Sequence, residues 1–343
     1  MKRMKMRSIA MMLAVGMTIG LAGCGTPPSD STAAAGSAAA PSEAEGSGGS
    51  KGPIVFSTKT ITNNEFQRVM VEEAEKAVEA AGYTFELTLS GDELAVSKQV
   101  ENIENAINKG ADGIIIAPMD GSAIIPVLEK AKKANIPVII ADAAVEEGHE
   151  DLYLTYIGSD NYNIGYEAGK QMIEKIGEGK VCTVRGASGA MGGELRAQGF
   201  EDAISESDKV KLVNQQAGNW LSDVAMQVTE NMLASDPDMK GIFNCSDGML
   251  SGVISGVENQ GLNPSDLTII SVDGDKAALD AIKNGKCYGC VAQYPRVIGQ
   301  KSAEIMVSLL NGDTTEDDYE KYIDSGYFFI NPDNTDEAED IVF

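Results

Sequence analysis

Two aspartates, Asp142 and Asp273, each end an apolar run of the sequence. A pair of carboxylates at opposing strand ends can act as general acid and base, as in glycosidases. Either residue can instead cap the N-terminus of a helix. A third use is ligand binding, because ionised carboxylates accept hydrogen bonds from hydroxyl groups worth about 1.5–3 kcal/mol each. Arg196 would add donors, so these three side chains fit a cleft that binds a polyhydroxylated molecule.

Two aromatic side chains lie at predicted strand-to-helix turns, where a ring can pack on the C–H face of a sugar. Trp220 is the only tryptophan of the chain, and Phe66 follows Asn64 at the first such turn. Large aromatic residues more often belong to the core. Both interpretations stay open at this level.

A glycine-rich segment, Gly186–Gly193, follows a predicted strand and precedes a helix, which is where a phosphate-binding loop would lie. It lacks the Lys-Ser/Thr of a Walker loop, and its spacing differs from the dinucleotide pattern G-x-G-x-x-G. We therefore expect a tight loop before the helix that carries Arg196, and no cofactor.

The cysteines and the histidine argue against redox, metal and nucleophilic chemistry. Cys287 and Cys290 have redox-motif spacing, but their neighbours predict a strand, in which residues three apart point to opposite faces. Cys182 and Cys245 fall in other predicted strands, so no metal site is expected, and the oxidation state of all four stays open. The single histidine, His149, lies in an acidic run, which argues against a multi-histidine zinc site and a Ser-His-Asp triad.

The composition is that of a large, acidic, folded protein. The 343 residues exceed what one hydrophobic core usually serves, so two domains are expected. A hydrophobic content of 43% with 23% charged residues is typical of globular proteins. The 52 acidic and 27 basic residues give a formal charge of −25, which argues against nucleic-acid binding.

The first 52 residues predict an anchor and not a domain. Residues 1–23 join a basic start to an uncharged run, as a secretory signal peptide does. The segment Leu-Ala-Gly-Cys that ends at Cys24 resembles the lipobox of bacterial lipoproteins, in which the cysteine is lipidated. Residues 24–52 are rich in Ala, Ser and Gly, which predicts a flexible linker. We expect an extracytoplasmic protein held by lipid at the outer face of the cytoplasmic membrane.

Beyond residue 52, short apolar runs alternate with segments of helical periodicity. Continuous apolar runs such as 136–140 and 267–272 are typical of strands buried on both faces. Strands separated by helices of this length predict right-handed βαβ units and parallel sheets. The order of elements that ends at Asp142 recurs in the segment that ends at Asp273. We predict an α/β fold of two Rossmann-like lobes side by side, with ligand residues at the carboxyl ends of the strands.

The order of several segments resembles the type-I periplasmic-binding-protein family, in particular the ribose-binding-like solute receptors of ABC importers. The resemblance covers nearly all of residues 53–330. Its most telling segments are T-N-N-E-F at 62–66, A-N-I-P-V-I at 134–139, I-G-S-D-N at 157–161, R-A-Q-G-F at 196–200, S-V-D-G at 271–274 and V-A-Q-Y-P at 291–295.

The resemblance implies ligand-binding roles for named positions. Asn64 and Phe66 would come from the first turn, with the ring flanking a sugar. Asp142 would bind ligand hydroxyls, and Arg196 would donate from the second lobe. Trp220 falls where the family places an aromatic residue that stacks on the ligand.

Asp273 and Gln293 would supply a hydroxyl-binding carboxylate and an amide near the hinge. The sequence also departs from the pattern. Ser246 stands where an asparagine is usual, Ala143 replaces an arginine, and Gln67 replaces a second aromatic ring. The ligand therefore need not be ribose.

The resemblance also implies that a multi-strand hinge joins the two lobes, and it implies how the chain is divided between them. We expect the N-terminal lobe at 53–159 and about 294–322, and the C-terminal lobe at 160–293 and about 323–343.

The predicted function is solute capture for transport. We expect a monomeric lipoprotein that captures a monosaccharide or similar polyhydroxylated small molecule by lobe closure and delivers it to the transmembrane subunits of an ABC importer. The alternative is a sensory receptor that presents a sugar or a furanone-like signal to a membrane kinase. No catalysis, metal or nucleic acid is expected.

Overall fold

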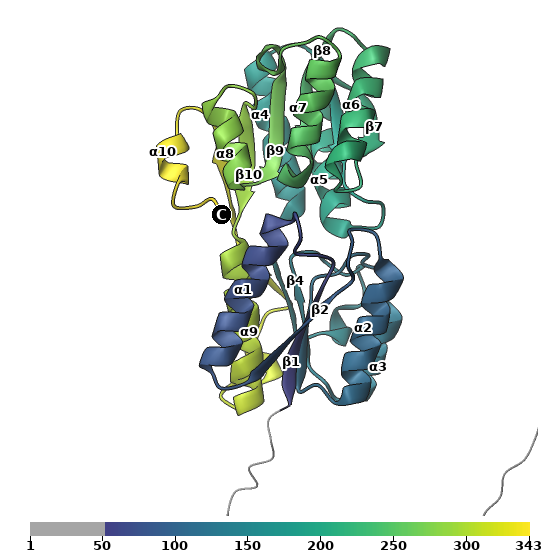
Figure 1. Cartoon of the computed structure of the whole chain (residues 1–343), viewed down its shortest axis with the longest axis vertical. Coiled ribbons are helices and arrows are strands. Elements are labelled where there is room, and N and C mark those ends of the chain that lie inside the picture. Colours follow the sequence, from purple (N-terminus) through teal and green to yellow (C-terminus); the bar gives the residue numbers. More distant parts are fainter. Residues whose placement is uncertain (1–51) are drawn as a thin grey trace, which may run out of the picture. The chain divides into compact units, whose positions relative to one another are not determined.

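Short apolar segments build two separate six-stranded sheets in the computed structural model, which describes residues 52–343 (Figure 1). The central strands are buried along their whole length, as their continuous apolar sequences predict. Each sheet carries helices on both faces, so the predicted α/β fold with two Rossmann-like lobes is confirmed.

The sheet of the N-terminal lobe has the order β11-β5-β4-β3-β1-β2, and all of its pairings are parallel. Its strands are β1 (Pro53–Thr58), β2 (Thr84–Leu89), β3 (Gly113–Ile116), β4 (Val138–Ala141), β5 (Thr155–Gly158) and β11 (Tyr322–Asp324). Its helices are α1 (Glu65–Ala80), α2 (Val96–Lys109), α3 (Ile125–Lys133) and α9 (Pro295–Asn311). One core contains Met70 of α1 and Met306 of α9, and a second contains Ile103 of α2 and Leu128 of α3.

The sheet of the C-terminal lobe has the order β12-β10-β9-β8-β6-β7, in which only β12 runs antiparallel to its neighbour. Its strands are β6 (Gly179–Arg185), β7 (Val210–Ala217), β8 (Met239–Asn244), β9 (Thr268–Asp273), β10 (Gly289–Gln293) and β12 (Tyr327–Ile330). Its helices are α4 (Asn161–Ile176), α5 (Met191–Ser205), α6 (Ser222–Ser235), α7 (Leu250–Asn259), α8 (Lys276–Lys283) and α10 (Thr335–Ala338). Short 3₁₀ turns complete the described elements at Glu150–Leu152, Asp247–Met249, Pro264–Asp266 and Glu316–Asp318.

The chain crosses between the lobes three times. It crosses after β5, after β10 and between β11 and β12, because those elements belong to different sheets. The last crossing follows Asp324 of β11, which pairs with Gly158 of β5, and so lies slightly later than the expected residue 322. Hydrogen bonds from the Ser159 hydroxyl to Gly326 O (2.9 Å) and with Ser325 (3.0 Å) join the first and third crossings.

The edge strands are the elements that the sequence shows least clearly. The polar, half-buried residues Asn214, Gln215 and Gln216 interrupt the apolar run of β7, which continues to Ala217 through its pairing with β6. The short strands β11 and β12 are recognisable only by their pairing with β5 and β10.

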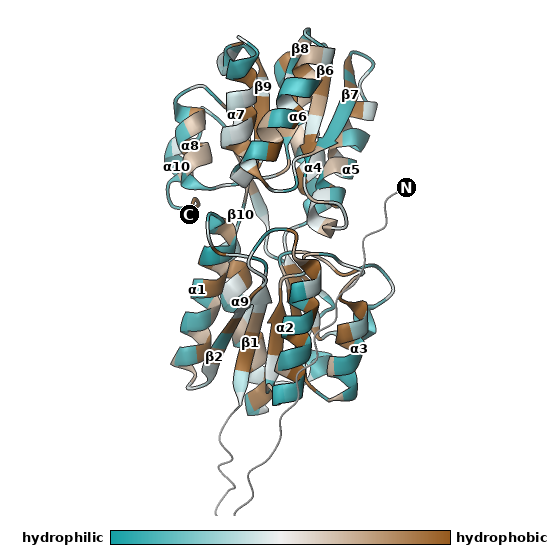
Figure 2. Cartoon of the chain, turned by 45° about the vertical axis from the view of Figure 1, so that its right-hand side comes forward, coloured by the Kyte–Doolittle hydropathy of each residue, from teal (hydrophilic) through white to brown (hydrophobic). Residues whose placement is uncertain are grey.

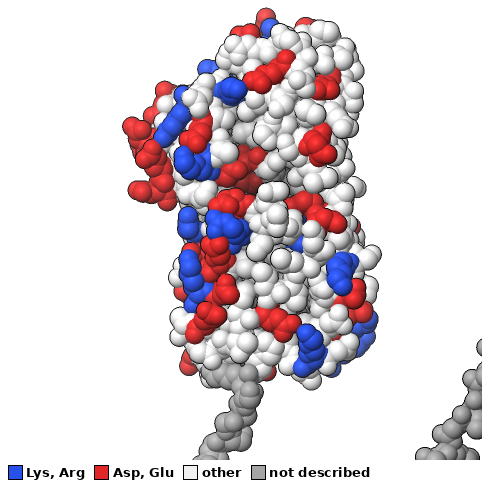
Figure 3. Space-filling model, viewed as in Figure 1, with Lys and Arg blue, Asp and Glu red and all other residues white. Residues whose placement is uncertain are grey.

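The surface matches the acidic composition. Figure 2 shows hydrophobic residues concentrated in the strands and hydrophilic residues on the outer faces of the helices. On the face drawn in Figure 3, acidic and basic side chains are spread over both lobes.

The helices of residues 52–343 are all too short or too polar to span a bilayer. The predicted signal peptide, Cys24 and the predicted linker up to residue 51 lie outside the described residues.

Candidate functional site

A cavity between the lobes gathers seven of the eight predicted ligand residues. It is lined by Lys59, Asn64, Phe66, Gln67, Glu93, Ala117, Pro118, Met119, Asp142, Ala143, Ala190, Gly192, Gly193, Arg196, Trp220, Ser246 and Asp273. The eighth residue, Gln293, is fully buried and donates from Nε2 to Asp273 Oδ1 at 2.8 Å. The cavity lies where the strands of both sheets end, as the rule for parallel sheets predicts.

Asp142 and Asp273 occupy equivalent places in the two sheets. Asp142 follows β4 and Asp273 ends β9, and both have positive φ angles, 67° and 125°. Non-glycine residues adopt such angles rarely, and aspartate is among those that do. Neither carboxylate caps a helix: Asp275 is the N-cap of α8, and the next helical turn after Asp142 begins at Glu150. The helix-cap interpretation is therefore wrong for both residues.

The C-terminal lobe contributes an ion pair between Arg196 and Asp273 to the wall of the cavity. Arg196 is 5% exposed, and its Nη1 lies 3.2 Å from Asp273 Oδ1. Nη1 also donates to Cys245 O at 2.7 Å, and Nε donates to Asn161 Oδ1 at 2.7 Å. Nη2 has no hydrogen-bond partner among residues 52–343, so this donor is available to a ligand.

Asp273 accepts hydrogen bonds on both carboxylate oxygens. Gln293 and Arg196 donate to Oδ1, while the Ser246 hydroxyl (2.6 Å) and the Asp247 amide (3.2 Å) donate to Oδ2. Four donors hold this buried carboxylate in one orientation and offset the cost of its burial. Asp273 thus aligns Arg196, Ser246 and Gln293 as one polar surface.

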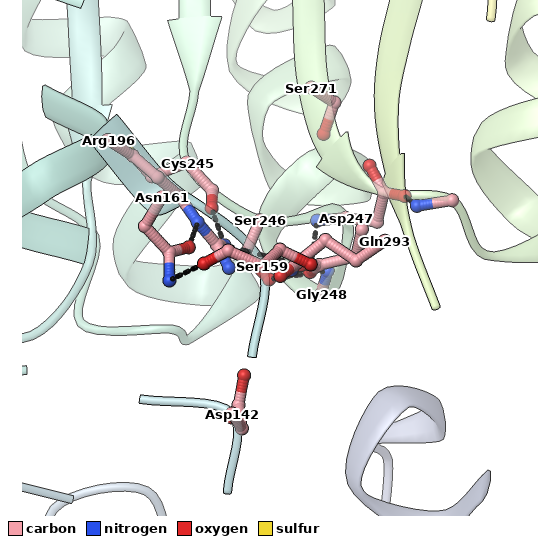
Figure 4. Close-up of polar contacts among 12 residues, drawn as sticks. Asp142, Ser159, Asn161, Arg196, Cys245, Ser246, Asp247, Gly248, Ser271 and Gln293 are labelled. Atoms are coloured by element: carbon pink, nitrogen blue, oxygen red, sulfur yellow. Dashed lines mark hydrogen bonds and ion pairs between the residues drawn. The ribbon is translucent and has the colours of Figure 1, made fainter. Parts of the chain in front are cut away.

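Asp142 presents its carboxylate from the opposite lobe, facing this cluster across the cavity (Figure 4). Gln67 Nε2 donates to its Oδ2 at 2.7 Å, and Gln67 Oε1 accepts from the Thr58 hydroxyl. Burial raises the pKa of the Asp142 carboxyl, while the positive charges of Lys59 and Arg196 act to lower it. Gln67, which stands in place of a second aromatic ring, is therefore a polar member of the site.

Sequence reasoning missed a second ion pair in the cavity wall. Lys59 Nζ lies 2.8 Å from Glu93 Oε2, and Asn64 Nδ2 donates to Glu93 Oε1 at 2.8 Å. Lys59 directly follows β1, and Glu93 lies in the loop after β2. The same rule that located Asp142 and Asp273 at strand ends would have found both residues, had it been applied to charged positions there.

Trp220 sits at the meeting of the two lobes. It and Asn219 have positive φ angles, and its ring packs where Gly186 and Gly193 leave room, since a Cβ at either glycine would lie within 2.7 Å of it. The Lys59 ammonium, from the other lobe, lies 5.1 Å from the ring centroid. A cation over the ring face is a favourable contact, and stacking of a ligand on Trp220 remains a prediction.

We expect Lys59→Met to destabilise the protein by about 2 kcal/mol or more, because Glu93 would keep its buried charge without a cation. Urea unfolding measures the loss. The double variant Lys59→Met/Glu93→Gln should regain most of it, because no charge is then left unpaired. The matched control is Lys76→Met, whose exposed pair with Glu73 should cost under about 1 kcal/mol. Equal losses in the two single variants would contradict the prediction.

An adjoining cavity extends the site toward Phe343. Its lining shares Asn64, Phe66 and Trp220 with the first cavity and adds Asp247, Asp275 and Phe343, among others. The rings of Phe66 and Phe343 meet edge to face at 5.7 Å between centroids, and the Phe343 main chain pairs with Gly274 and Lys276. Phe66 is thus 8% exposed and packs against an aromatic ring while lining the cavity, so the core and site interpretations both hold for it.

Asp275 provides a pH-dependent contribution to stability. Burial, with the nearby negative charge of Asp273, raises the pKa of its carboxyl to about 6. A raised carboxyl pKa means that the folded state disfavours the ionised form, so stability falls as the pH rises from about 4 to 6 and stays lower above that.

We expect Asp275→Asn to raise the free energy of unfolding by up to about 2 kcal/mol at pH 7.5, because asparagine keeps the N-cap and removes the charge. The gain should shrink as the pH falls toward 4. Urea unfolding at several pH values measures it. The matched control is Asp266→Asn, which removes a carboxylate at the exposed surface. A gain that is equal at pH 4 and pH 7.5 would contradict the prediction.

The described cysteines are buried thiols. Cys182, Cys245, Cys287 and Cys290 are all free, and burial raises the pKa of each thiol, which suppresses the reactive thiolate. Among residues 52–343, no group of three or more histidine, cysteine or acidic side chains is arranged to hold a metal ion.

Two α/β lobes with a polar cavity between the ends of their strands define a two-lobed ligand-binding protein. The chain belongs to the family described as "Periplasmic binding protein domain", whose model matches residues 54–314. It is similar to the ribose import binding protein of Bacillus subtilis (strain 168), at 32% identity over 217 residues, covering 63% of this chain and 68% of that protein. The resemblance to ribose-binding-like receptors is thereby confirmed.

Two solved structures of solute-binding proteins with bound sugars are also similar to this chain. An ABC transporter solute-binding protein from Agrobacterium vitis with bound D-fucose is 30% identical, with a TM-score of 0.79, and covers 85% of this chain and 100% of its own. A periplasmic solute-binding protein from Actinobacillus succinogenes 130z with bound D-allose is 29% identical, with a TM-score of 0.76, covering 84% and 100%. These relatives are sugar-binding proteins of transporters and not enzymes, which argues against a general acid–base role for Asp142 and Asp273.

Proposed function

We propose that this chain captures a neutral monosaccharide or a similar polyhydroxylated molecule between its lobes and delivers it to an ABC importer. The observation that carries the proposal is the cavity itself. Arg196, with its available Nη2, faces Asp142 across the cavity, so that donors and acceptors come from both lobes. A ligand that bonds to both lobes would favour the closed arrangement, because only that arrangement satisfies both sets of groups.

The charges of the cavity favour a neutral ligand. Both cationic side chains of its lining are already paired, Lys59 with Glu93 and Arg196 with Asp273. Asp142 adds a further carboxylate, and no lysine or arginine among residues 52–343 forms an ion pair with it. An anionic sugar would therefore meet net negative charge, whereas hydroxyl groups can both donate to Asp142 and accept from Arg196.

The ligand test is a thermal-shift and calorimetric screen of D-ribose, D-allose, D-fucose, L-arabinose and myo-inositol, with D-glucuronate and ribose 5-phosphate as anionic controls. We expect at least one neutral compound to bind with a Kd near 1 μM, which corresponds to about −8 kcal/mol. Saturation at a hundred times Kd should add about 2.7 kcal/mol of stability. Binding of the anions alone, or of no compound, would overturn the proposal.

The anchor is tested separately. We propose that Cys24 is lipidated, a proposal that the lipobox-like sequence supports. Wild-type protein expressed in a bacterium should incorporate labelled palmitate and partition with membranes, and Cys24→Ser should do neither.

Deletion of the gene tests whether the protein serves transport or sensing. Loss of labelled-sugar uptake on deletion would support delivery to a permease. Unchanged uptake, with loss of a transcriptional response to the sugar, would instead support the sensory alternative.

A further inference from the structure

The first crossing between the lobes contacts a ligand group on each side of the cavity. Tyr156 of β5 donates from its hydroxyl to Asp142 O at 3.0 Å. Asn161, the first residue of α4, accepts at Oδ1 from Arg196 Nε at 2.7 Å. Two residues five positions apart in the chain thus contact Asp142 and Arg196, which come from different lobes.

The Asn161 amide is fixed in orientation by a second hydrogen bond. Its Nδ2 donates to Ser159 O at 3.2 Å, which leaves the amide oxygen for Arg196 (Figure 4). The side chain is 3% exposed. Capping of α4 does not explain it, because Asp160 is the N-cap and accepts from the Asn163 amide.

The hydrogen bond from Arg196 Nε to Asn161 determines the direction of Nη2, the donor that has no partner among residues 52–343. The guanidinium is planar, so bonds from Nε to Asn161 and from Nη1 to Cys245 and Asp273 fix the plane and therefore the direction of Nη2. Without Asn161, the group is held by Nη1 alone and can rotate about that nitrogen.

Tyr156 holds Asp142 in the N-terminal lobe as Asn161 holds Arg196 in the C-terminal lobe. Its ring stacks on Tyr322 at 5.2 Å between centroids, and Gly158 leaves room for its hydroxyl, since a Cβ there would lie 2.5 Å from the hydroxyl oxygen. The bond to Asp142 O holds a main chain whose φ of 67° is otherwise uncommon.

We propose that Tyr156 and Asn161 are positioning residues that orient Asp142 and Arg196 for the ligand, an inference that rests on the proposed function. The crossing segment then aligns the ligand groups of both lobes before binding. Such preorganisation raises affinity because less ordering remains to be done when the ligand binds.

The test measures Kd by calorimetry with D-ribose, D-allose, D-fucose and myo-inositol. Asn161→Ala should weaken the tightest of these complexes by roughly tenfold or more, and Tyr156→Phe by about threefold. Asn161→Asp keeps an acceptor for Nε but loses the Nδ2 donor to Ser159 O, so it should recover only part of the affinity. The matched control is Asn163→Ala, two residues along the same helix and exposed, which should bind as the wild type does.

A double-mutant cycle separates positioning from a general loss of structure. In an Arg196→Lys background the amide no longer has an Nε–H to hold, so Asn161→Ala should cost little further affinity. An unchanged Kd in Asn161→Ala, or an equal loss in the Arg196→Lys background, would overturn the inference. If Asn161→Ala does not fold, an unchanged Kd in Tyr156→Phe would overturn it. A wild type that binds none of the four sugars would refute the proposed function first, and the inference with it.

Discussion

Arg196→Ala should weaken sugar binding by roughly a hundredfold or more, from a Kd near 1 μM to about 100 μM or above by calorimetry. The substitution removes Nη2, the available donor of the cavity wall, and it also removes the cation that neutralises Asp273. The Asp273 carboxylate would remain buried with three neutral donors. We therefore expect unfolding free energy to fall by about 3 kcal/mol as well.

Two further variants give this prediction its controls. Arg196→Lys keeps a charge near Asp273 but cannot reproduce the planar set of donors, so stability should recover more than affinity does. Arg296→Ala removes an exposed arginine that lies 3.8 Å from Glu73, and it should leave both quantities nearly unchanged. Full retention of affinity in Arg196→Ala would refute the assignment of this residue to the site.

Gly165→Ala is the second substitution from which we expect a large effect. A Cβ on Gly165 would lie 1.9 Å from the main-chain oxygen of Arg196, so helices α4 and α5 would have to move apart. Backbone cannot rotate away as a side chain does, and overpacking of this kind commonly costs about 1–3 kcal/mol. At 1.9 Å from a backbone atom we expect the upper end of that range, which exceeds the roughly 1 kcal/mol that alanine gains over glycine in a helix.

The displacement would carry the Arg196 side chain with it. We therefore expect Gly165→Ala to lower the unfolding free energy by about 2 kcal/mol and the affinity by about tenfold. Chemical denaturation and calorimetry measure the two effects. Gly192→Ala is the stability control, because the nearest atom to its Cβ lies at 3.5 Å, an ordinary contact. A Gly165→Ala protein as stable as the wild type would contradict the close approach of these helices.

The sequence predicted site residues correctly where a residue directly follows a strand that is recognisable from its own apolar run. Continuous apolar runs such as β3 and β4 identify buried strands, and the residues that follow them must lie at one edge of the sheet. Asp142 and Asp273 could be located in this way. The periodicity does not, however, say that Asp273 would be held by four donors and act by aligning its neighbours.

The parts that escaped prediction depend on contacts between distant segments. Gln67 looks like a polar position of α1, and only the approach of Asp142, 75 residues later, gives it a partner. Lys59 and Glu93 lie after different strands and meet because β1 and β2 are neighbours in the sheet. The strand β11 is short and edge-exposed, so its membership of the first sheet follows from its pairing with β5 alone.

The fluorescence of the single tryptophan can report on the separation of the two lobes. Trp220 is the only indole of the chain, and a lysine of the opposite lobe lies over it. A charge at that distance shifts indole emission, so any change in the separation of the lobes should alter the fluorescence of one identified residue. Stopped-flow mixing with a sugar could then follow closure in real time without an added label, and Lys59→Met would show how much of the signal comes from the ammonium.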